Sequence, residues 1–192
     1  ADVWDLGVST TPMVYWATTH LNADASVQIT ASHNPAEYNG LKISRTGALP
    51  VGGDSGLKDL EKMVNEKPVS PSERKGKVKD YSHVKDEYIE YFLPLSKGLE
   101  DLNLSVDCSN GMSNLVIKEI LANNKNVHYI YDTFDGTFPN HEPNPLEEKN
   151  CRALEKEVVK NNSDVGVIYD GDADRVIFVD DRGEWVQPDY VT

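Results

Sequence analysis

Two patterns of apolar residues alternate along the chain, and they predict helices in some segments and strands in others. Thr11-Pro12 has the form of an N-cap followed by proline, and Val14, Ala17 and Leu21 then recur at helical intervals. The same spacing predicts further helices over residues 55–64, 84–92, 113–123 and 146–161. Short apolar runs predict strands over residues 27–30, 41–44, 104–107, 127–131, 165–169 and 176–179.

Some of these segments also carry expectations about packing and turns. The helix over 55–64 is expected to begin at a Ser55 cap and to bury a face made of Leu57, Leu60 and Val64. The helix over 84–92 is expected to bury Val84, Tyr88, Tyr91 and Phe92. Asn39-Gly40 is a strong turn signal ahead of strand 41–44, and Asp181-Arg182-Gly183 is interpreted as the hairpin turn between the last two strands.

The order of the elements indicates an α/β protein with two parts. From residue 102 onward strands and helices alternate, and the strands are almost continuously apolar, which favours layers of helices on a sheet. Residues 65–80 are polar and contain two prolines, so we expect an exposed connection there. A boundary at 97–102 divides the chain into domains 1–98 and 99–192. The sequence opens without Met and closes on what reads like the start of another element, so we expect a fragment.

Composition excludes some classes of partner. The 192 residues are 39% hydrophobic and 27% charged, which is ordinary for a globular protein. With 19 basic and 32 acidic residues the net charge is −13, which argues against a nucleic-acid partner. No stretch approaches the ~20 apolar residues of a membrane span. The two cysteines are too few for a disulfide scaffold, so a cytoplasmic location is expected.

The most informative stretch for chemistry is Asp170-Gly171-Asp172-Ala173-Asp174-Arg175, which follows the apolar strand 165–169. Carboxylates at alternate positions can converge on one side of a loop, and hard oxygen ligands of this kind suit Mg²⁺. A calcium loop of the EF-hand type is excluded, because its sixth and twelfth positions would be Arg175 and Asp181 instead of Gly and Glu. A solvated acidic turn, and a phosphatase with Asp170 as nucleophile, remain open.

A second stretch, Thr30-Ala31-Ser32-His33-Asn34-Pro35, places a hydroxyl in a turn-forming segment ahead of Lys42. A serine is a poor phosphate carrier alone, but a nearby divalent ion neutralises phosphate charge and polarises the bond that breaks. Lys42 could serve as acid or base if burial or nearby cations lower its pKa. Taken singly, Lys42 could be a solvated charge, His33 a loop histidine, and Arg175 an ion-pair partner of the aspartates.

Together these two stretches resemble the α-D-phosphohexomutase superfamily, in its phosphomannomutase/phosphoglucomutase branch. Asp5-Leu6-Gly7 with Thr11-Pro12 is similar to the segment ahead of that family's serine loop, and Asn39-Gly40-x-Lys42 to its lysine context. Val106-Asp107 with Asn110-Gly111 resembles the opening of its second domain, and residues 138–145 its loop before the metal site. The resemblance covers essentially the whole chain.

The resemblance implies three-layer mixed-sheet domains, of which this chain holds part of the first and most of the second, without domains 3 and 4 or the N-terminal strand region of the first. It implies a phosphoprotein of carbohydrate metabolism that interconverts hexose 1-phosphate and hexose 6-phosphate through a phosphoserine and a hexose 1,6-bisphosphate, which also acts as activator. Catalysis is assigned to Ser32, Lys42, His33 and Arg175, substrate binding to these four and Asn34, and one Mg²⁺ to Ser32, Asp170, Asp172 and Asp174.

The alternatives are phosphoglucosamine mutase, the Asp-nucleophile phosphatase, and a non-catalytic piece that binds only metal or a partner domain. The Thr-Ala-Ser loop and Ala173 favour the phosphomannomutase/phosphoglucomutase branch. The expected partners are a small phosphosugar and the missing domains, with neither nucleic acid nor membrane. The chain by itself is expected to be inactive.

Overall fold

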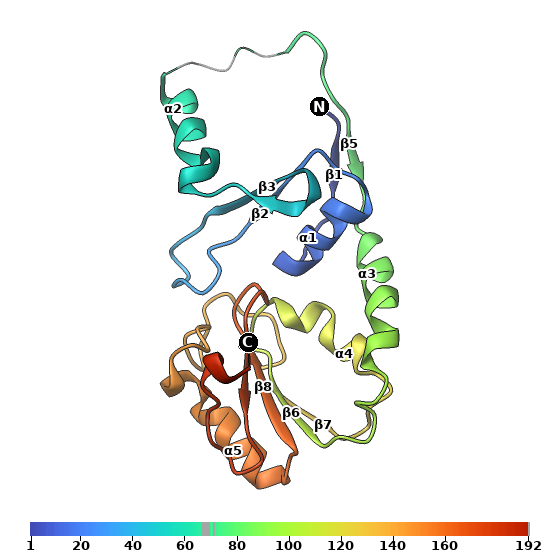
Figure 1. Ribbon diagram of the computed structural model, residues 1–192, viewed down its shortest axis with the longest axis vertical. Coiled ribbons are helices and arrows are strands. Elements are labelled where there is room, and N and C mark those ends of the chain that lie inside the picture. The colour runs from blue at the N-terminus through green and yellow to red at the C-terminus, as the bar shows by residue number, and fades with distance from the viewer. Residues whose placement is uncertain (67–69, 71, 192) are drawn as a thin grey trace.

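The computed structural model describes residues 1–66, 70 and 72–191. Figure 1 shows an upper part that holds α1 and the first strands, a lower part built on a second sheet, and helix α3 running between them. The polar connection expected over 65–80 lies partly outside the described residues, at 67–69 and 71, and its end forms the short strand β5 (Val78–Asp80). Within the described residues, none of the helices has the length and apolar character needed to cross a bilayer.

The first part carries two small sheets around helix α1 (Thr11–His20). Strand β1 (Val3–Asp5) pairs in parallel with β5, while β2 (Ala25–Ile29), β3 (Leu41–Arg45) and β4 (Leu49–Pro50) form an antiparallel sheet. Gly40 O accepts a hydrogen bond from Thr30 N at 3.0 Å, which closes the long loop between β2 and β3. This loop, carrying Ser32, is therefore held at both ends by paired strands.

Helix α1 begins one residue earlier than its cap signal suggests. Thr10 is the N-cap, its hydroxyl accepting from Met13 N at 3.1 Å, so that Thr11 and Pro12 are the first two helical residues. Met13 and Ala17 on α1 pack against Val84 and Tyr88 on α3 (Val84–Phe92) in the first buried cluster. Thr11 is thereby freed from capping and faces another part of the molecule.

The second part is a four-stranded sheet in the order β7-β6-β8-β9 with helices on both faces (Figure 1). Strands β6 (Leu104–Asp107), β7 (Val127–Ile130) and β8 (Val165–Tyr169) are parallel, and β9 (Val176–Val179) runs antiparallel to β8. Helix α5 (Arg152–Asn161) packs Leu154 and Val158 on one face, and α4 (Ile117–Ile120) packs on the other. The expected α/β fold with three layers is confirmed in this sheet.

The helix predicted over 113–123 is wrong. The segment forms a short turn of 3₁₀ helix (Met112–Leu115) and then α4, with Val116 at φ −131° between them. Val116 packs in the cluster with α1 and α3, whereas Ile117 and Leu121 pack on the sheet. One straight helix could not serve both cores, so the chain breaks where the apolar residues change sides.

The hairpin assignment is also wrong. The turn between β8 and β9 is Asp170–Arg175, so the candidate metal loop is itself the hairpin. Asp181–Gly183 follows β9 and returns the chain to an isolated bridge between Val179 and Trp185. Aspartate and glycine in 181–183 are a local turn signal, but the turn between the two strands is the aspartate loop, in which Asp170 accepts from the backbone of Arg175.

One predicted inner face is exposed, and one residue of another is exposed. Helix α2 (Lys58–Glu66) follows a wide turn at Gly53–Leu57 and stands away from β2 and β3 in Figure 1. Its predicted inner residues are exposed: Leu57, Leu60 and Val64. In α3 Tyr91 is exposed, and Ile89 takes its place in the core. A periodic pattern predicts an apolar face, but the packing partner decides whether that face is buried.

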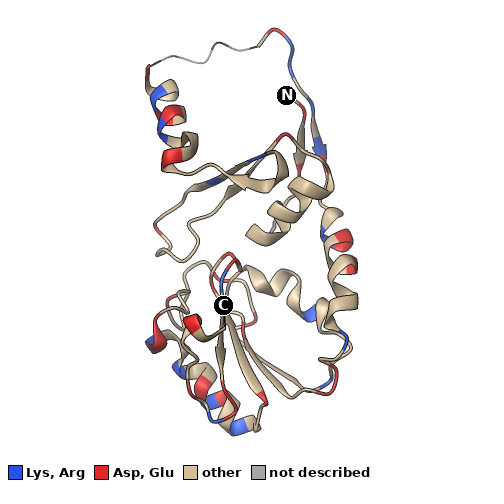
Figure 2. Cartoon of the chain, in the orientation of Figure 1, with Lys and Arg blue, Asp and Glu red and all other residues tan. Residues whose placement is uncertain are grey.

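Charge is dispersed over the helices. Figure 2 shows acidic and basic residues interspersed along α2, α3 and α5. Several of these form short-range pairs, such as Arg152 with Glu148 and Lys160 with Glu157. Exposed pairs of this kind contribute little to stability, so they serve mainly to keep the outer helix faces polar.

A tight contact between α5 and the sheet gives a test of this packing. A Cβ added to Gly166 in β8 would lie 2.6 Å from Val158 Cγ2 and 3.0 Å from Val179 Cβ. We expect Gly166→Ala to lower the free energy of unfolding by about 1–3 kcal/mol, because α5 would have to move off the sheet. Denaturant unfolding measures this effect.

The matched control is Gly136→Ala, since nothing lies within 4 Å of a Cβ at that position. Equal stabilities of the two variants would contradict the close packing of α5 on β8.

Candidate active site

The Ser32 loop holds an unusual backbone conformation. Ser32 has φ +57°, in the left-handed region, and its backbone N donates to Thr30 Oγ1 at 2.8 Å. Asn34 folds back on the same loop, with both its backbone N and its Nδ2 donating to Ala31 O. A non-glycine residue in this region costs about 1–2 kcal/mol, and such strain tends to occur where a side chain must be presented in one direction.

The hydroxyl of Ser32 points at the acidic hairpin. Ser32 Oγ lies 3.3 Å from Asp170 Oδ2 and 3.4 Å from Asp172 Oδ1, although these residues are 138 and 140 positions away in sequence. Arg175 Nη2 donates to Ser32 Oγ at 3.3 Å, and His33 Nδ1 lies at the same distance from it. The structure therefore brings the predicted serine to the predicted metal loop.

Two glycines allow this approach. A Cβ on Gly171 would collide with the backbone oxygen of Ser32. On the other side of the hairpin, a Cβ on Gly111 would lie 2.7 Å from Gly171 O, which accepts a hydrogen bond from Met112 N. Any larger side chain at Gly171 would push the serine loop away from the carboxylates.

The three aspartates converge. Asp170, Asp172 and Asp174 each offer an oxygen within 4.8 Å of the others. Asp170 and Asp172 are buried, and Asp174 is open to solvent. Ala173 between them adopts φ +63°, which folds the loop tightly.

The two buried carboxylates differ in proton affinity. Burial and the neighbouring charge of Asp172 raise the pKa of Asp170 above its ordinary value. Burial also opposes ionisation of Asp172, but hydrogen bonds from Lys42 and Thr11 outweigh it and hold its pKa below the ordinary value. Like charges in one site push their pKa values apart in this way, and a divalent cation relieves the repulsion. The donor set, all carboxylate oxygens with a hydroxyl beside them, fits Mg²⁺.

Lys42 lies over the outer edge of the acidic loop. Its Nζ donates to Asp172 Oδ2 at 2.7 Å and to Asp174 Oδ2 at 2.5 Å. Burial lowers the pKa of Lys42, but the hydrogen bonds and charges of these carboxylates outweigh it, and the net pKa is raised. Lys42 is therefore a protonated donor in this arrangement.

Arg175 clamps the opposite side of the loop. Its Nε and Nη2 bind Asp170 Oδ2 at 3.0 and 2.9 Å, and its backbone N donates to Asp170 Oδ1. For His33, burial and the positive charge of Arg175 lower the pKa, so its imidazole is neutral at pH 7. Of the predicted site residues, Asn34 alone bonds only within its own loop among the described contacts.

Sequence reasoning missed two polar contacts of the site. Thr11 Oγ1 donates to Asp172 Oδ2 at 2.7 Å, and Asn144 Oδ1 accepts from Arg175 Nη1 at 3.3 Å. Thr11 was interpreted as a helix cap, and Asn144 was noted only within the 138–145 segment. No local pattern marks either residue, because each meets its partner through the tertiary fold.

The loop that carries Asn144 is anchored at its base by a buried pair. His141 Nε2 lies 3.0 Å from Asp107 Oδ2, and His141 Nδ1 lies 2.8 Å from Glu142 O. Asn140 Nδ2 donates to Asn110 Oδ1 beside them at 2.7 Å. Burial lowers the pKa of His141, but the hydrogen bond and charge of Asp107 outweigh it, and the net pKa is raised.

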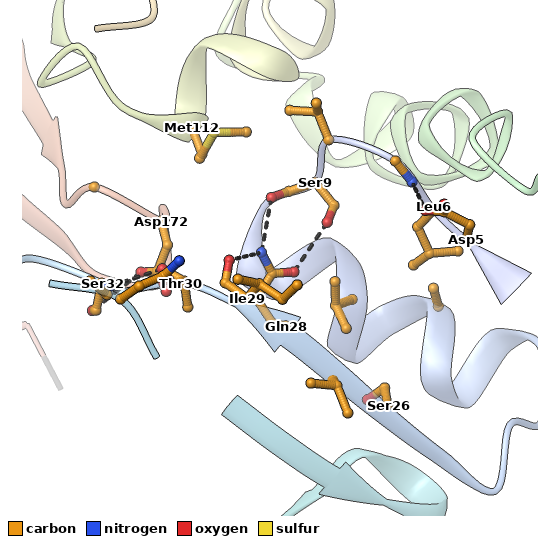
Figure 3. Close-up of a pocket in the computed structure, with 18 of the residues that line it drawn as sticks. Asp5, Leu6, Ser9, Ser26, Gln28, Ile29, Thr30, Ser32, Met112 and Asp172 are labelled. Carbon is orange, nitrogen blue, oxygen red and sulfur yellow. Dashed lines mark hydrogen bonds between the residues drawn. The ribbon is translucent and has the colours of Figure 1, made fainter. Parts of the chain in front are cut away.

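A cavity of about 1280 Å³ adjoins the site (Figure 3). In Figure 3 Ser32 and Asp172 lie at one end of it, Asp5 lies at the other, and Ser9 and Gln28 lie between them. Lys42, His33 and Arg175 are not among its lining residues. The reacting end of the site therefore opens on this space through Ser32 and Asp172.

Known proteins share this sequence and fold. Residues 1–68 match the model of phosphoglucomutase/phosphomannomutase alpha/beta/alpha domain I, and residues 86–183 match that of alpha/beta/alpha domain II. The phosphomannomutase of Salmonella montevideo is 37% identical over 201 residues, which cover 99% of this chain and 44% of the relative. That of Escherichia coli K12 is 34% identical with the same coverage.

A solved structure of a phosphoglucomutase/phosphomannomutase family protein from Burkholderia thailandensis superposes with a TM-score of 0.81 at 27% identity, over 98% of this chain and 42% of that one. The fold and the two family matches define an α/β phosphohexomutase-type protein. The chain belongs to the phosphoglucomutase/phosphomannomutase family, and it spans less than half the length of the curated relatives that it matches.

The buried pair of His141 and Asp107 predicts that the stability of the fold depends on pH. Because the folded-state pKa of His141 is raised, the pair stabilises the fold fully below the ordinary imidazole pKa of about 6.5, and this contribution is lost as the pH rises through the raised value. His141→Gln should therefore destabilise the protein more near pH 6 than near pH 9, by a difference on the order of 1 kcal/mol. Denaturant unfolding at a series of pH values measures it.

The control is His128→Gln, which removes an exposed imidazole from β7. A loss of stability in His141→Gln that is the same at every pH would show that the pair contributes packing alone.

Proposed function

We propose that this chain carries the phosphoryl-transfer half of a phosphohexomutase. The observation that carries the proposal is the position of Ser32 Oγ, within 3.4 Å of two aspartates, an arginine and a histidine. A cluster of acidic and basic side chains could hold a metal without a serine. The fold does not require a serine with a strained backbone and an inward-facing hydroxyl at this position, so Ser32 is better explained as the group that carries phosphate. The names of the relatives support the same reaction class.

The proposed reaction exchanges one phosphoryl group between Ser32 and a hexose. Phosphoserine 32 gives its phosphoryl group to the 6-hydroxyl of a hexose 1-phosphate: the P–Oγ bond breaks, a P–O6 bond forms, the hydroxyl loses a proton and Ser32 Oγ regains one. The hexose 1,6-bisphosphate then reorients and returns its other phosphate to Ser32. The product is hexose 6-phosphate, and every step is reversible.

The contacts of each side chain indicate its role in the proposed reaction. Lys42, protonated and next to the carboxylates, serves as general acid in one half-reaction and as base in the reverse. Arg175 and the neutral His33 contact Ser32 Oγ and would hold the phosphoryl oxygens or help proton transfer. Asn34 contributes to substrate binding through the shape of the loop, since its amide is committed to Ala31.

We propose that Ser32, Asp170, Asp172 and Asp174 hold one Mg²⁺. When bound, the ion neutralises phosphate charge and polarises the bond to the transferred phosphorus. The carboxylates would then act as its ligands, and Arg175 keeps Asp170 oriented through two hydrogen bonds and an ion pair.

The substrate is proposed to be mannose or glucose phosphate, with glucosamine phosphate as the alternative. The phosphatase alternative gives Asp170 the nucleophile's role. The structure offers it little support, since Oδ2 of Asp170 already accepts from Arg175 and Ser32. We also propose domains 1–98 and 99–192, because the face of α3 that carries Val84 and Tyr88 packs on α1. A cytoplasmic location is proposed as well, because both cysteines are free and buried.

Phosphate on Ser32 is the direct test. Incubation with glucose 1,6-bisphosphate and Mg²⁺ should add one phosphate to the chain, measured by intact mass, and Ser32→Ala should abolish it. The exposed Ser70→Ala is the control. An adduct that persists in Ser32→Ala but disappears in Asp170→Asn would establish the phosphatase alternative instead.

The same samples test whether these residues suffice for turnover. The side chains described at the site gather around Ser32 Oγ, so we propose that they hold the reacting phosphate and that turnover needs further contacts to position the other end of a bisphosphate. A coupled assay with mannose 1-phosphate or glucose 1-phosphate is expected to show no turnover. Rates at the usual enzyme scale of ~1–10³ per second would contradict this.

Metal binding is predicted to stabilise the fold. A ligand that binds only the folded state adds about 2.7 kcal/mol at a hundred times its dissociation constant, so the melting temperature should rise with Mg²⁺ concentration. Asp172→Asn should remove that rise, while Asp181→Asn, in the exposed turn after β9, should keep it. Equal shifts in the parent and Asp172→Asn would refute the site.

A further inference from the structure

One polar group in contact with the acidic loop has no role in the proposed chemistry. Thr11, at the start of α1, is fully buried and donates from Oγ1 to Asp172 Oδ2 at 2.7 Å. Its backbone N also donates to Asp172 O at 3.0 Å. Thr10 supplies the N-cap, so neither group of Thr11 is needed to cap the start of the helix.

The two oxygens of Asp172 have different partners. Oδ2 accepts from Thr11 Oγ1 and Lys42 Nζ, each at 2.7 Å. Oδ1 lies 3.4 Å from Ser32 Oγ, and Asp172 offers one of its oxygens to the cluster of three aspartates. A partial rotation of this carboxylate about its Cβ–Cγ bond would turn Oδ1 away from the serine without bringing Oδ2 into its place.

Lys42 alone leaves that rotation possible, because its long side chain is 27% exposed. Thr11 is fully buried and comes from a helix whose first turn is fixed by Thr10 and Pro12. Its neutral hydroxyl can therefore hold Oδ2 in one place.

We propose that Thr11 is a positioning residue, which keeps Asp172 Oδ1 directed at Ser32 and the cation. The proposal rests on the function proposed above. Thr11 touches neither the phosphoryl group nor the sugar and acts through Asp172. It also ties the start of α1 to the hairpin after β8, so that the loop bearing the aspartates is set by the part of the chain that carries Ser32.

The test separates the hydroxyl from the rest of the side chain. Thr11→Val keeps the shape and the backbone bond to Asp172 but removes Oγ1, whereas Thr11→Ser keeps the donor and loses the methyl group. The matched control is Thr18→Val, a second buried threonine on α1, whose hydroxyl bonds Val14 O and Ser26 Oγ away from the site.

Two measurements are made on each full chain: Mg²⁺ affinity by calorimetry, and the rate of Ser32 phosphorylation at saturating glucose 1,6-bisphosphate. Removing an outer partner of a metal ligand typically weakens affinity or activity by about 10- to 100-fold. We expect a loss of that size in Thr11→Val, values near the parent's in Thr11→Ser, and unchanged Mg²⁺ affinity and rate in Thr18→Val. The bisphosphate concentration for half-maximal rate should stay the same in all.

Parent-like values in Thr11→Val would overturn the role, and so would an equal loss in Thr11→Ser and Thr11→Val. If Thr11→Val does not fold, Thr11→Ala against Thr11→Ser makes the same comparison, since these two differ by the hydroxyl alone. A parent chain that takes neither Mg²⁺ nor phosphate refutes the proposed function and this role with it, whereas a competent parent with an equally competent Thr11→Val refutes the role of Thr11 only.

Discussion

The contact between the Ser32 loop and the Asp170–Arg175 hairpin decides whether this chain has a site. Ser32 lies in the loop after β2 and the aspartates lie in the turn after β8, so neither segment forms a reactive site alone. The loops meet because Gly171 has no side chain to separate its backbone from that of Ser32. Left-handed backbone at Ser32 then turns the hydroxyl onto the carboxylates. Packing of the two parts, through α1, α3 and Val116, maintains this approach.

Charge explains why such a contact suits phosphate chemistry. Three aspartates and two cations, Lys42 and Arg175, leave one net negative charge around Ser32 Oγ. A phosphoryl group would add further negative charge, and the cluster could not accept it in a partly buried place without a divalent cation. The proposed phosphoserine and the proposed Mg²⁺ therefore depend on each other, and the raised pKa of Asp170 reports the repulsion that the ion would relieve.

Local sequence patterns predicted correctly those features of the fold that depend on neighbouring residues. The bounds of β6, β8 and β9 were correct, because β8 and β9 are almost continuously apolar, the apolar residues of β6 alternate with Ser105 and Asp107, and all three strands end at polar turns. The hairpin between β8 and β9 was misplaced, because its turn is held by the Asp170 carboxylate instead of by glycine. The break at Val116, the exposed face of α2, and the contacts of Thr11 and Asn144 all depend on partners distant in sequence. Spacing along the chain carries no information about those partners.

The raised pKa of Lys42 likewise depends on residues that are distant in sequence. Burial alone would lower the pKa of this lysine and favour a base, but the fold that buries it also places Asp172 and Asp174 against its Nζ, and their attraction prevails. Lys42 therefore enters the cycle with its proton, which suits the half-reaction in which Ser32 Oγ leaves phosphorus and needs one. Of the two donors on Asp172 Oδ2, Lys42 has a partly exposed side chain, whereas Thr11 is fully buried. The threonine is therefore the donor better suited to fix the carboxylate, as the lysine is to give up a proton.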